Sequence, residues 1–384
     1  MYHLFAVSPP GLEPYTAREL TQLGIPPGDG QSSAQPSEHG GIEFSGDLDA
    51  LYRANLYTRT ASRILLRFGQ FHAASFSELD KGIKKLPWAR YLSPGTACAI
   101  RVTCHKSRLY HSSAVAREIA TSISAYLRHP IQQTRFDENA SNVLPQLIVV
   151  RLNNDQCTIS IDTSGAHLHR RGYRLATAKA PLRENLAAGL LMASGWDMDS
   201  PLLDPFCGSG TIPIEAALMA LHIPPGAVRR FAFMDWPGYQ ADRWEAILTE
   251  SKKQITNHAT LIQASDRDAG AITLARANAE RAGVATSIEF SHRAISAIEP
   301  PAHGYLVTNP PYGLRVSKNK DLRNLYAQLG KVLRKRCPGW TVAILCNDFS
   351  LLRQLGMPLN TELSLVNGGV SVLVGRAIVP QDQP

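Results

Sequence analysis

The chain has 384 residues, a length typical of two domains. Of these residues 44% are hydrophobic and 19% are charged, a composition typical of a soluble protein. No apolar run approaches the roughly 20 residues that span a bilayer, and the N-terminus lacks a secretory signal, so we expect neither a membrane-spanning nor a secreted protein. The net charge is +8 at pH 7, which favours a polyanionic partner.

Short apolar runs alternate with turn residues over residues 1–58. In chain order they predict a strand at 4–7, a helix at 13–23, a loop rich in Pro, Gly and Ser at 26–41, a second strand at 42–44 and a second helix at 48–56. We expect these elements to form a small α+β unit.

Short apolar runs also alternate with turn residues over residues 59–165. It predicts strands at 64–71, 97–103, 147–152 and 157–161 and helices at 76–85 and 113–127. Arg59, Arg63 and Arg67 recur every four residues, which is compatible with a solvated charged face and with a nucleic-acid patch.

Histidines and cysteines are scattered without the spacing of a metal site. His105, His111, His167 and His169 have no carboxylate or cysteine at matching spacing, so we expect no metal. The six cysteines form no CxxC pair, which argues against a disulfide framework and favours a reducing cytoplasm.

A short basic segment separates the two halves of the chain. Residues 166–180 contain Arg170, Arg171, Arg174 and Lys179 and no acid, and so supply half of the net charge of +8. We interpret this segment as a linker between domains.

From Pro181 onward, longer helices alternate with buried strands. The predicted helices are 182–194, 211–220, 269–282 and 321–333, and the predicted strands are 201–203, 261–265, 287–290, 305–307, 341–345, 363–366 and 370–378. The last two strands flank Asn-Gly-Gly, a strong hairpin signal. The fold class is therefore α/β, with a doubly wound, mostly parallel sheet that ends in an antiparallel hairpin.

Three motifs follow three of these strands. Asp204–Gly210 is a glycine loop that opens a helix, but it is neither a dinucleotide fingerprint nor a Walker loop. Asp266 ends the next strand, where its carboxylate can take both hydroxyls of a ribose. Together the glycine loop and the acid indicate a nucleoside site.

The third motif is Asn309-Pro310-Pro311-Tyr312. Its prolines stop the strand, and they leave an amide oxygen, the Pro310 carbonyl and an aromatic ring on a rigid turn. Such a turn can grip a planar group that carries an exocyclic amine, although a proline-stopped strand with a surface tyrosine would look the same.

These residues carry a family resemblance. The motifs DPFCGSG, SDRD and NPPY resemble class I S-adenosylmethionine-dependent methyltransferases that act on exocyclic amines of nucleic acids. With residues 180–188 and 233–236, the basic run RRGYR and the N-terminal runs PGLE and GIEF, nearly the whole chain resembles the THUMP-domain RNA guanine-N2 methyltransferases of the RlmL family.

The resemblance implies a Rossmann-like methyltransferase domain over 181–384, preceded by a smaller α+β, THUMP-containing RNA-binding domain. Within the latter, 1–58 would be ferredoxin-like, 59–165 THUMP-like and 166–180 the basic linker. The implied activity makes N2-methylguanosine in RNA, of which 23S ribosomal RNA is the expected substrate.

It also implies roles for individual residues. Asn309 and the Pro310 carbonyl would orient the amine, and Tyr312 would stack on the base. S-adenosylmethionine would contact Asn309 and the following residues: Ala180, Pro181, Leu182, Asp204, Phe206, Gly208, Gly210 and Asp266. Arg170, Arg171 and Arg174 would contact RNA phosphates. Ala294 takes the place of the acid that usually binds adenine, so Asp268 or the backbone would hold that ring.

Two alternatives stay open. The NPPY turn suits an adenine-N6 methyltransferase of DNA or RNA, or a cytosine-N4 methylase of DNA, as well as a guanine-N2 enzyme. A non-catalytic RNA-binding or ribosome-assembly factor could retain the fold. Oligomeric state and the modified nucleotide do not follow from the sequence.

Overall fold

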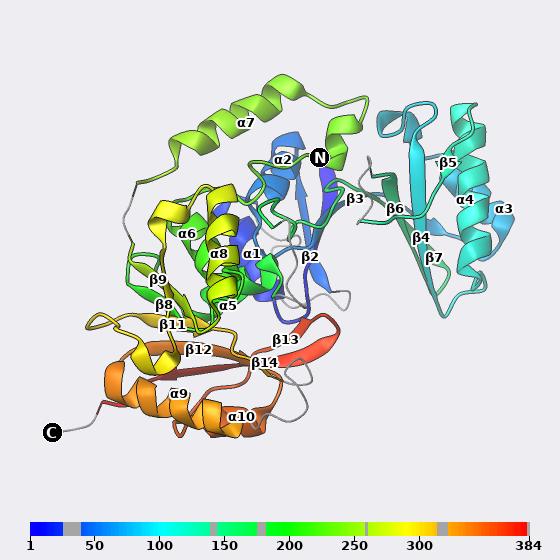
Figure 1. Ribbon diagram of the computed structural model, residues 1–384. Helices are drawn as coiled ribbons and strands as arrows, with labels where there is room; N and C mark the ends of the chain where they lie inside the picture. Colours follow the sequence, from blue (N-terminus) through cyan, green and yellow to red (C-terminus); the bar gives the residue numbers. More distant parts are fainter. Residues whose placement is uncertain (26–39, 139–143, 175–181, 258–259, 313–321, 382–384) are drawn as a thin grey trace. The chain divides into compact units, whose positions relative to one another are not determined.

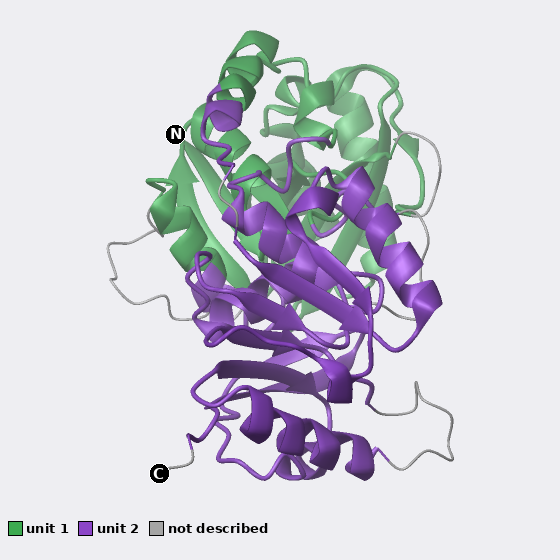
Figure 2. Cartoon of the chain, turned by 60° about the vertical axis from the view of Figure 1, so that its left-hand side comes forward, with its two compact units in different colours: residues 1–7, 16–168, 229–249 green, residues 8–15, 169–228, 250–384 purple. Residues whose placement is uncertain are grey.

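The structure is a computed structural model that describes residues 1–25, 40–138, 144–174, 182–257, 260–312 and 322–381. The chain divides into two compact units, shown in green and purple in Figure 2. Unit 1 comprises Met1–Val7, Thr16–Leu168 and Arg229–Thr249, and unit 2 comprises Ser8–Tyr15, His169–Val228 and Glu250–Pro384. Of the predicted loop 26–41, residues 26–39 lie outside the described part.

Unit 1 is built on one seven-stranded sheet in the order β2-β1-β3-β7-β6-β4-β5. The strands are β1 (Tyr2–Val7), β2 (Gly41–Gly46), β3 (Arg63–His72), β4 (Ala97–His105), β5 (Gln132–Gln133), β6 (Gln146–Asn153) and β7 (Gln156–Asp162). β3 pairs with β1 through residues 63–67 on one side and with β7 through residues 65–72 on the other, and the β3–β7 register shifts between Arg67 and Gly69. One long strand thus joins the two halves of the sheet.

The helices of unit 1 bury apolar faces predicted from the sequence. They are α1 (Glu13–Gln22, whose first turn belongs to unit 2), α2 (Leu48–Tyr57), α3 (Phe76–Lys84) and α4 (Ser112–Leu127). α3 and α4 lie side by side in Figure 1 and bury Leu79, Ile83, Val115, Ile119 and Ile123.

The core of unit 1 also contains residues from far along the chain. Phe231, Phe233, Trp236, Trp244 and Ile247 belong to the same hydrophobic cluster as the residues of β1 to β7. They come from residues 229–249, which include most of α7 (Ala241–Lys253). The apolar pattern gave no prediction for α7.

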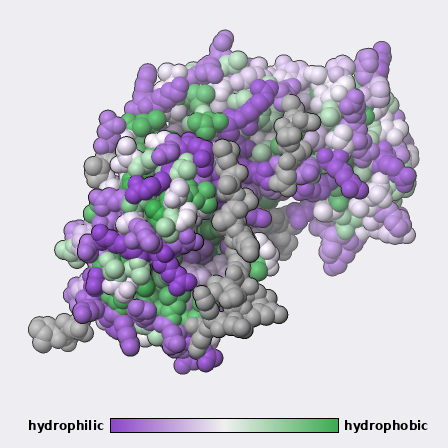
Figure 3. Space-filling model, in the orientation of Figure 1, coloured by the Kyte–Doolittle hydropathy of each residue, from purple (hydrophilic) through white to green (hydrophobic). Residues whose placement is uncertain are grey.

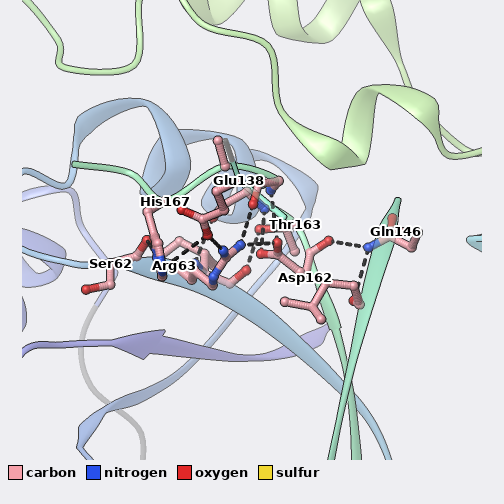
Figure 4. A network of polar contacts seen from close by, with 12 residues as sticks. Ser62, Arg63, Glu138, Gln146, Asp162, Thr163 and His167 are labelled. Atoms are coloured by element: carbon pink, nitrogen blue, oxygen red, sulfur yellow. Dashed lines mark hydrogen bonds and ion pairs between the residues drawn. The ribbon is translucent and has the colours of Figure 1, made fainter. Parts of the chain in front are cut away.

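A polar network lies beneath the ends of β3 and β7 (Figure 4). The buried Arg63 donates to Asp162 at 2.6 Å and, at shorter range, to Glu138. His167 contacts the same Glu138 oxygen at 3.1 Å. The predicted charged face at Arg59, Arg63 and Arg67 is therefore wrong for Arg63, because its guanidinium is buried and paired.

Unit 2 holds the predicted doubly wound sheet, in the order β10-β9-β8-β11-β12-β14-β13. The strands are β8 (Leu202–Asp204), β9 (Ile262–Asp266), β10 (Glu289–His292), β11 (Tyr305–Thr308), β12 (Thr341–Cys346), β13 (Ser364–Asn367) and β14 (Val370–Ile378). The first five pair in parallel, and β14 and β13 close the sheet as an antiparallel hairpin. The predicted fold class is confirmed.

Helices cover both faces of this sheet (Figure 1). α5 (Glu184–Ser194), α6 (Thr211–Ala220) and α8 (Ala269–Arg281) lie on one face, and α9 (Arg323–Arg336) and α10 (Phe349–Arg353) lie on the other. Gly195 ends α5 in the left-handed conformation, at a φ of 75°, as glycine commonly does at this position.

The N-terminal segment 8–15 packs into unit 2. Leu12 is fully buried in the core of that unit, against Gly189 of α5. A Cβ on Gly11 would lie 2.2 Å from the carbonyl oxygen of Ser364, and Gly11 has a φ of +88°. Only glycine fits here without strain, which explains the PGLE motif in physical terms.

No helix among the described residues is long and apolar enough to cross a bilayer. The face of the molecule drawn in Figure 3 is largely hydrophilic, with smaller hydrophobic areas between the hydrophilic residues.

Candidate active site

The glycine loop follows β8 and is held by the buried carboxylate of Asp204 and the half-buried carboxylate of Asp266. Asp204 ends β8, and its Oδ1 accepts hydrogen bonds from the Phe206 N–H at 3.2 Å and from the Thr308 hydroxyl at 2.6 Å. Gly208 N–H donates to Asp266 Oδ2 at 3.0 Å. The loop backbone is thereby tied to the ends of three strands.

Glycine is required at the end of this loop. Gly210 has a φ of +85°, and a Cβ there would lie 3.0 Å from the Cβ of Ala275 on α8. α6 begins directly afterwards at Thr211. The close approach of the loop to α8 shapes a backbone cradle at the N-terminus of a helix, where a charged ligand can be bound.

Asp266 at the end of β9 orders the next turn as well. Its Oδ1 accepts from the Asp268 N–H at 3.0 Å. Asp268 is exposed and caps α8, because its Oδ1 accepts from the Gly270 N–H at 2.8 Å. The predicted contact of Asp268 with adenine would therefore compete with helix capping. Ala294 is exposed and follows Arg293, whose N–H donates to the Asp266 carbonyl.

The Asn-Pro-Pro-Tyr turn follows β11, the strand that lies next to β8. The side-chain oxygen of Asn309 is buried and accepts no hydrogen bond from any described residue. The Tyr312 ring is buried, with 5% of its surface exposed, and its hydroxyl accepts from the Asn367 amide at 3.3 Å. An acceptor without a donor, deep in the protein, is costly unless a ligand satisfies it.

The electrostatics of the site centre on Asp204. The pKa of its carboxyl is raised to about 7, chiefly by burial and to a smaller extent by the nearby Asp266, while the hydrogen bonds from Thr308 and Phe206 oppose the shift. An ammonium group beside Asp204 would favour the ionised carboxylate. Burial likewise raises the pKa of the Cys207 thiol above its ordinary range, so this cysteine is a poor nucleophile.

The basic run 170–174 is in large part internal. Arg171 is 3% exposed and pairs at 3.4 Å with Glu215 of α6, to which the Tyr173 hydroxyl also donates. Arg174 donates to the Leu182 carbonyl at 3.1 Å and lies 3.6 Å from Glu184. The prediction that Arg171 contacts RNA phosphates is corrected, because its guanidinium is buried and paired within unit 2.

Arg170 is exposed, in agreement with the predicted phosphate contact, although the contact itself stays a prediction. Ala180 and Pro181 lie outside the described residues. Leu182 is buried beside Arg174. No group of three or more His, Cys, Asp or Glu in the described part of the chain is arranged to hold a metal.

Family models match almost every part of this architecture. The RMKL-like methyltransferase domain matches residues 171–374, more than half of the chain. The chain belongs to this family. The RlmL ferredoxin-like domain matches residues 3–65, and the THUMP domain matches residues 73–162. The resemblance inferred from the motifs is confirmed.

Relatives agree with this assignment. A protein of Synechocystis sp., named as a candidate RNA methyltransferase, is 35% identical over 95% of this chain and 94% of its own length. The ribosomal RNA large subunit methyltransferases K/L of Methylococcus capsulatus and Shewanella baltica are 35% and 36% identical over 95% and 96% of this chain. The chain spans only about half of their length, 50% and 52%.

Solved structures give the same result. The solved structure of SMU.472, which is named as a candidate methyltransferase and is complexed with SAH, has a TM-score of 0.84 and 29% sequence identity to this chain. The match covers all of this chain and 99% of the SMU.472 chain. A protein of Listeria monocytogenes, named as a predicted N6-adenine-specific DNA methylase, has a TM-score of 0.83 and 32% identity over 97% of this chain and 95% of its own. The cofactor of the RMKL-like domain is S-adenosylmethionine. The buried Asp204, the glycine cradle and the Asn309 oxygen, which has no donor among the described residues, suit it.

Sequence reasoning missed several partners of the site residues. Thr308 was adjacent to the motif but carried no signal of its own. Asn367 lies in a turn sequence, where no rule predicts that its amide turns inward toward Tyr312. Glu184 and Glu215 read as ordinary helix residues, although both are buried.

Proposed function

We propose that this protein transfers a methyl group from S-adenosylmethionine to the exocyclic N2 amine of a guanosine in RNA, with 23S ribosomal RNA as the substrate. The observation that carries the proposal is the buried oxygen of Asn309, which accepts no hydrogen bond from a described residue and stands beside the cradle formed by Asp204 and the glycine loop. The THUMP domain and the names of the K/L relatives support an RNA substrate.

The residues of this chain would act by orientation. The Asn309 oxygen and the Pro310 carbonyl accept the two amine protons, which turns the nitrogen lone pair toward the methyl donor. The bound cofactor supplies an electrophilic methyl group on sulfur. When the N–C bond forms, the C–S bond breaks and its electron pair stays on sulfur. The nitrogen then loses a proton to water, and no covalent enzyme intermediate is needed.

Tyr312 would hold the base. Its hydroxyl accepts a hydrogen bond from Asn367, which fixes the orientation of the largely buried ring. A guanine taken out of its helix or loop can stack on this ring while its amine reaches Asn309. Asp204 would bind the ammonium group of the cofactor and Asp266 its ribose.

An adenine-N6 methyltransferase is the second candidate, because the Listeria relative bears such a name. The turn fits either amine, since Asn309 and Pro310 contact only the N–H groups. The THUMP domain, matched over residues 73–162, favours RNA over DNA.

Mass spectrometry of nucleosides tests the proposal. Ribosomal RNA from a strain that lacks the gene should lose N2-methylguanosine at one position, and the purified protein should restore it. Asn309→Ala should abolish this transfer and keep the affinity for the cofactor. Restoration of N6-methyladenosine in place of N2-methylguanosine would establish the second candidate. Unchanged modification at every site, together with no binding of S-adenosylmethionine by calorimetry, would instead indicate a non-catalytic factor.

A further inference from the structure

The guanidinium of Arg174 joins two parts of unit 2 that flank the candidate cofactor site. One of its nitrogens, Nη2, donates to the Leu182 carbonyl at 3.1 Å and also to the Thr211 hydroxyl. Leu182 is one of the expected cofactor contacts, and Thr211 opens α6 directly after Gly210 of the glycine loop. Because both bonds start from the same nitrogen, the Leu182 carbonyl and the Thr211 hydroxyl are held close to each other.

These bonds connect segments that lie apart in the sequence. Leu182 is 8 positions and Thr211 is 37 positions from Arg174. Leu182 comes just before α5 and Thr211 begins α6, and these two helices pack against each other. Arg174 therefore fixes the separation between the N-terminal ends of both helices.

Burial and charge keep the guanidinium of Arg174 inside unit 2. Its side chain is only 10% exposed, and it lies 3.6 Å from the buried carboxylate of Glu184. Burial raises the pKa of Glu184, and the positive charge of Arg174 opposes this shift. A guanidinium that is held inward by a carboxylate and two oxygen acceptors is better suited to positioning its neighbours than to contact with a phosphate at the surface.

A second set of contacts ties the residue before Arg174 to the glycine loop. Asn278 of α8 is fully buried, and its amide donates to the Ser209 carbonyl of the loop at 2.9 Å. Arg281 donates to the Asn278 side-chain oxygen and, at 2.7 Å, to the Tyr173 carbonyl. Tyr173 and Arg174 are thus connected to the loop at two points, one through α8 and one at the start of α6.

We propose that Arg174 is a positioning residue for the cofactor. It acts through Leu182 and Thr211, which it holds at the separation that S-adenosylmethionine requires. A site whose walls are already ordered by such contacts loses less conformational freedom when the ligand enters. The proposal rests on the expected place of the cofactor between the glycine loop and Leu182, and it is independent of which base is methylated.

Isothermal titration calorimetry with S-adenosylmethionine and the full chain tests the proposal. R174K keeps a positive charge beside Glu184, but a compact ammonium does not reproduce the fork of a guanidinium. T211V removes the hydroxyl acceptor without a change in shape. Each variant should bind the cofactor about tenfold more weakly than the wild type. Because both act on one contact, R174K/T211V should bind no more weakly than the weaker single variant. T211S keeps the hydroxyl and should bind nearly as well as the wild type.

The matched control is R376K, at the other end of α5. The Arg376 guanidinium donates to the Ala193 carbonyl at 3.1 Å and to the Asn360 side-chain oxygen at 3.5 Å. Like Arg174, it is half-buried and tethers a carbonyl and a side-chain oxygen. R376K should therefore lower the melting temperature, as R174K does, and retain the cofactor affinity of the wild type.

Normal affinity in R174K or T211V, additive losses in the double variant, or an equal loss in R376K would overturn the proposal. The measurement requires no methyl transfer. A wild type that binds the cofactor, with the expected losses in the variants, and methylates no guanosine would overturn the proposed function alone. A wild type that methylates guanosine, with unchanged cofactor affinity in R174K and T211V, would overturn the positioning role alone.

Discussion

Thr308 donates a hydrogen bond of 2.6 Å to Asp204, and both side chains are buried. Thr308 is the last residue of β11 and directly precedes Asn309, whereas Asp204 ends the neighbouring strand β8. This bond therefore links the carboxylate expected to bind the cofactor with the turn expected to bind the amine.

Thr308→Val should weaken cofactor binding about tenfold at pH 7.5, because it removes a donor to a buried carboxylate without a change in shape. It should also shift the protonation of Asp204 to higher pH, since the hydrogen bond from Thr308 holds that pKa down. Isothermal titration calorimetry measures both effects. Thr308→Ser keeps the hydroxyl and should bind nearly as well as the wild type; a Val variant with normal affinity would show that the link has no role in binding.

Asp204→Asn should raise the thermal stability of the cofactor-free protein and abolish cofactor binding. Burial raises the pKa of Asp204 from 3.8 to about 7, so the folded state holds this proton more tightly than the unfolded state. The resulting stability is fully present below about pH 4 and is lost as the pH rises through about 7. The gain in melting temperature should therefore be larger at pH 8 than at pH 5, and an equal gain at both would contradict the assignment.

The raised pKa of Asp204 also predicts how the cofactor affinity of the wild type depends on pH. Ionised Asp204 binds the ammonium group, so affinity should fall as the pH drops below about 7. It should also fall above about pH 8, where an α-amino group loses its proton. Calorimetric titrations should run from pH 6 to pH 9, about one pH unit beyond each limit. The cofactor affinity should pass through a maximum within this range, and a flat profile would exclude Asp204 as the binding group.

Asn367 and Tyr312 should act as one unit in turnover. The Asn367 amide donates to the Tyr312 hydroxyl at 3.3 Å, and both residues are buried. Asn367→Ala and Tyr312→Phe each remove this bond, so we expect each to lower kcat about tenfold while cofactor affinity is retained. Because both act through the same contact, the double variant should be no slower than the slower single variant. Additive losses in steady-state kinetics would separate their roles.

Whether the sequence could predict a structural feature depends on how far apart along the chain its residues lie. β8, β9 and β11 were predicted from apolar runs, and glycine and proline positions marked their ends, because these signals are local. The pairs Thr308–Asp204 and Asn367–Tyr312 join residues that are 104 and 55 positions apart. No periodicity or turn rule specifies which way such a side chain points, so only the fold reveals the pair.

The predicted phosphate contact of Arg171 was wrong for a related reason. Arg171 and Arg174 look like a surface patch because no acid lies near them in sequence. Their acids, Glu215 and Glu184, lie on α6 and α5 and contact them only after folding. Counting charges along the sequence therefore overestimated the positive charge that this segment makes available to a polyanion.

Arg171→Ala should lower the free energy of unfolding by about 3 kcal/mol, because it leaves Glu215 buried without its partner. It should leave the salt dependence of RNA binding unchanged. Arg170→Ala is the matched neighbour: Arg170 is exposed, so its loss should change stability by less than about 0.5 kcal/mol. Urea denaturation followed by tryptophan fluorescence measures the difference, and similar stability for the two variants would contradict the internal role of Arg171.

Residues 229–249 should be required for unit 1 to fold. Phe231, Phe233 and Trp244 lie in its core, Trp236 donates to Gln146 at 2.8 Å, and α7 is tied to Asp49 through Arg243. The fragment 1–168 lacks these side chains and should show no cooperative thermal transition, because a gap of this size removes several large aromatic groups from the core. The same fragment joined through a Gly/Ser linker to residues 229–249 should regain a cooperative transition and near-UV circular dichroism. Phe233→Ala in that fusion should cost about 3–5 kcal/mol, and a fragment 1–168 that melts as sharply as the fusion would show that the segment is dispensable.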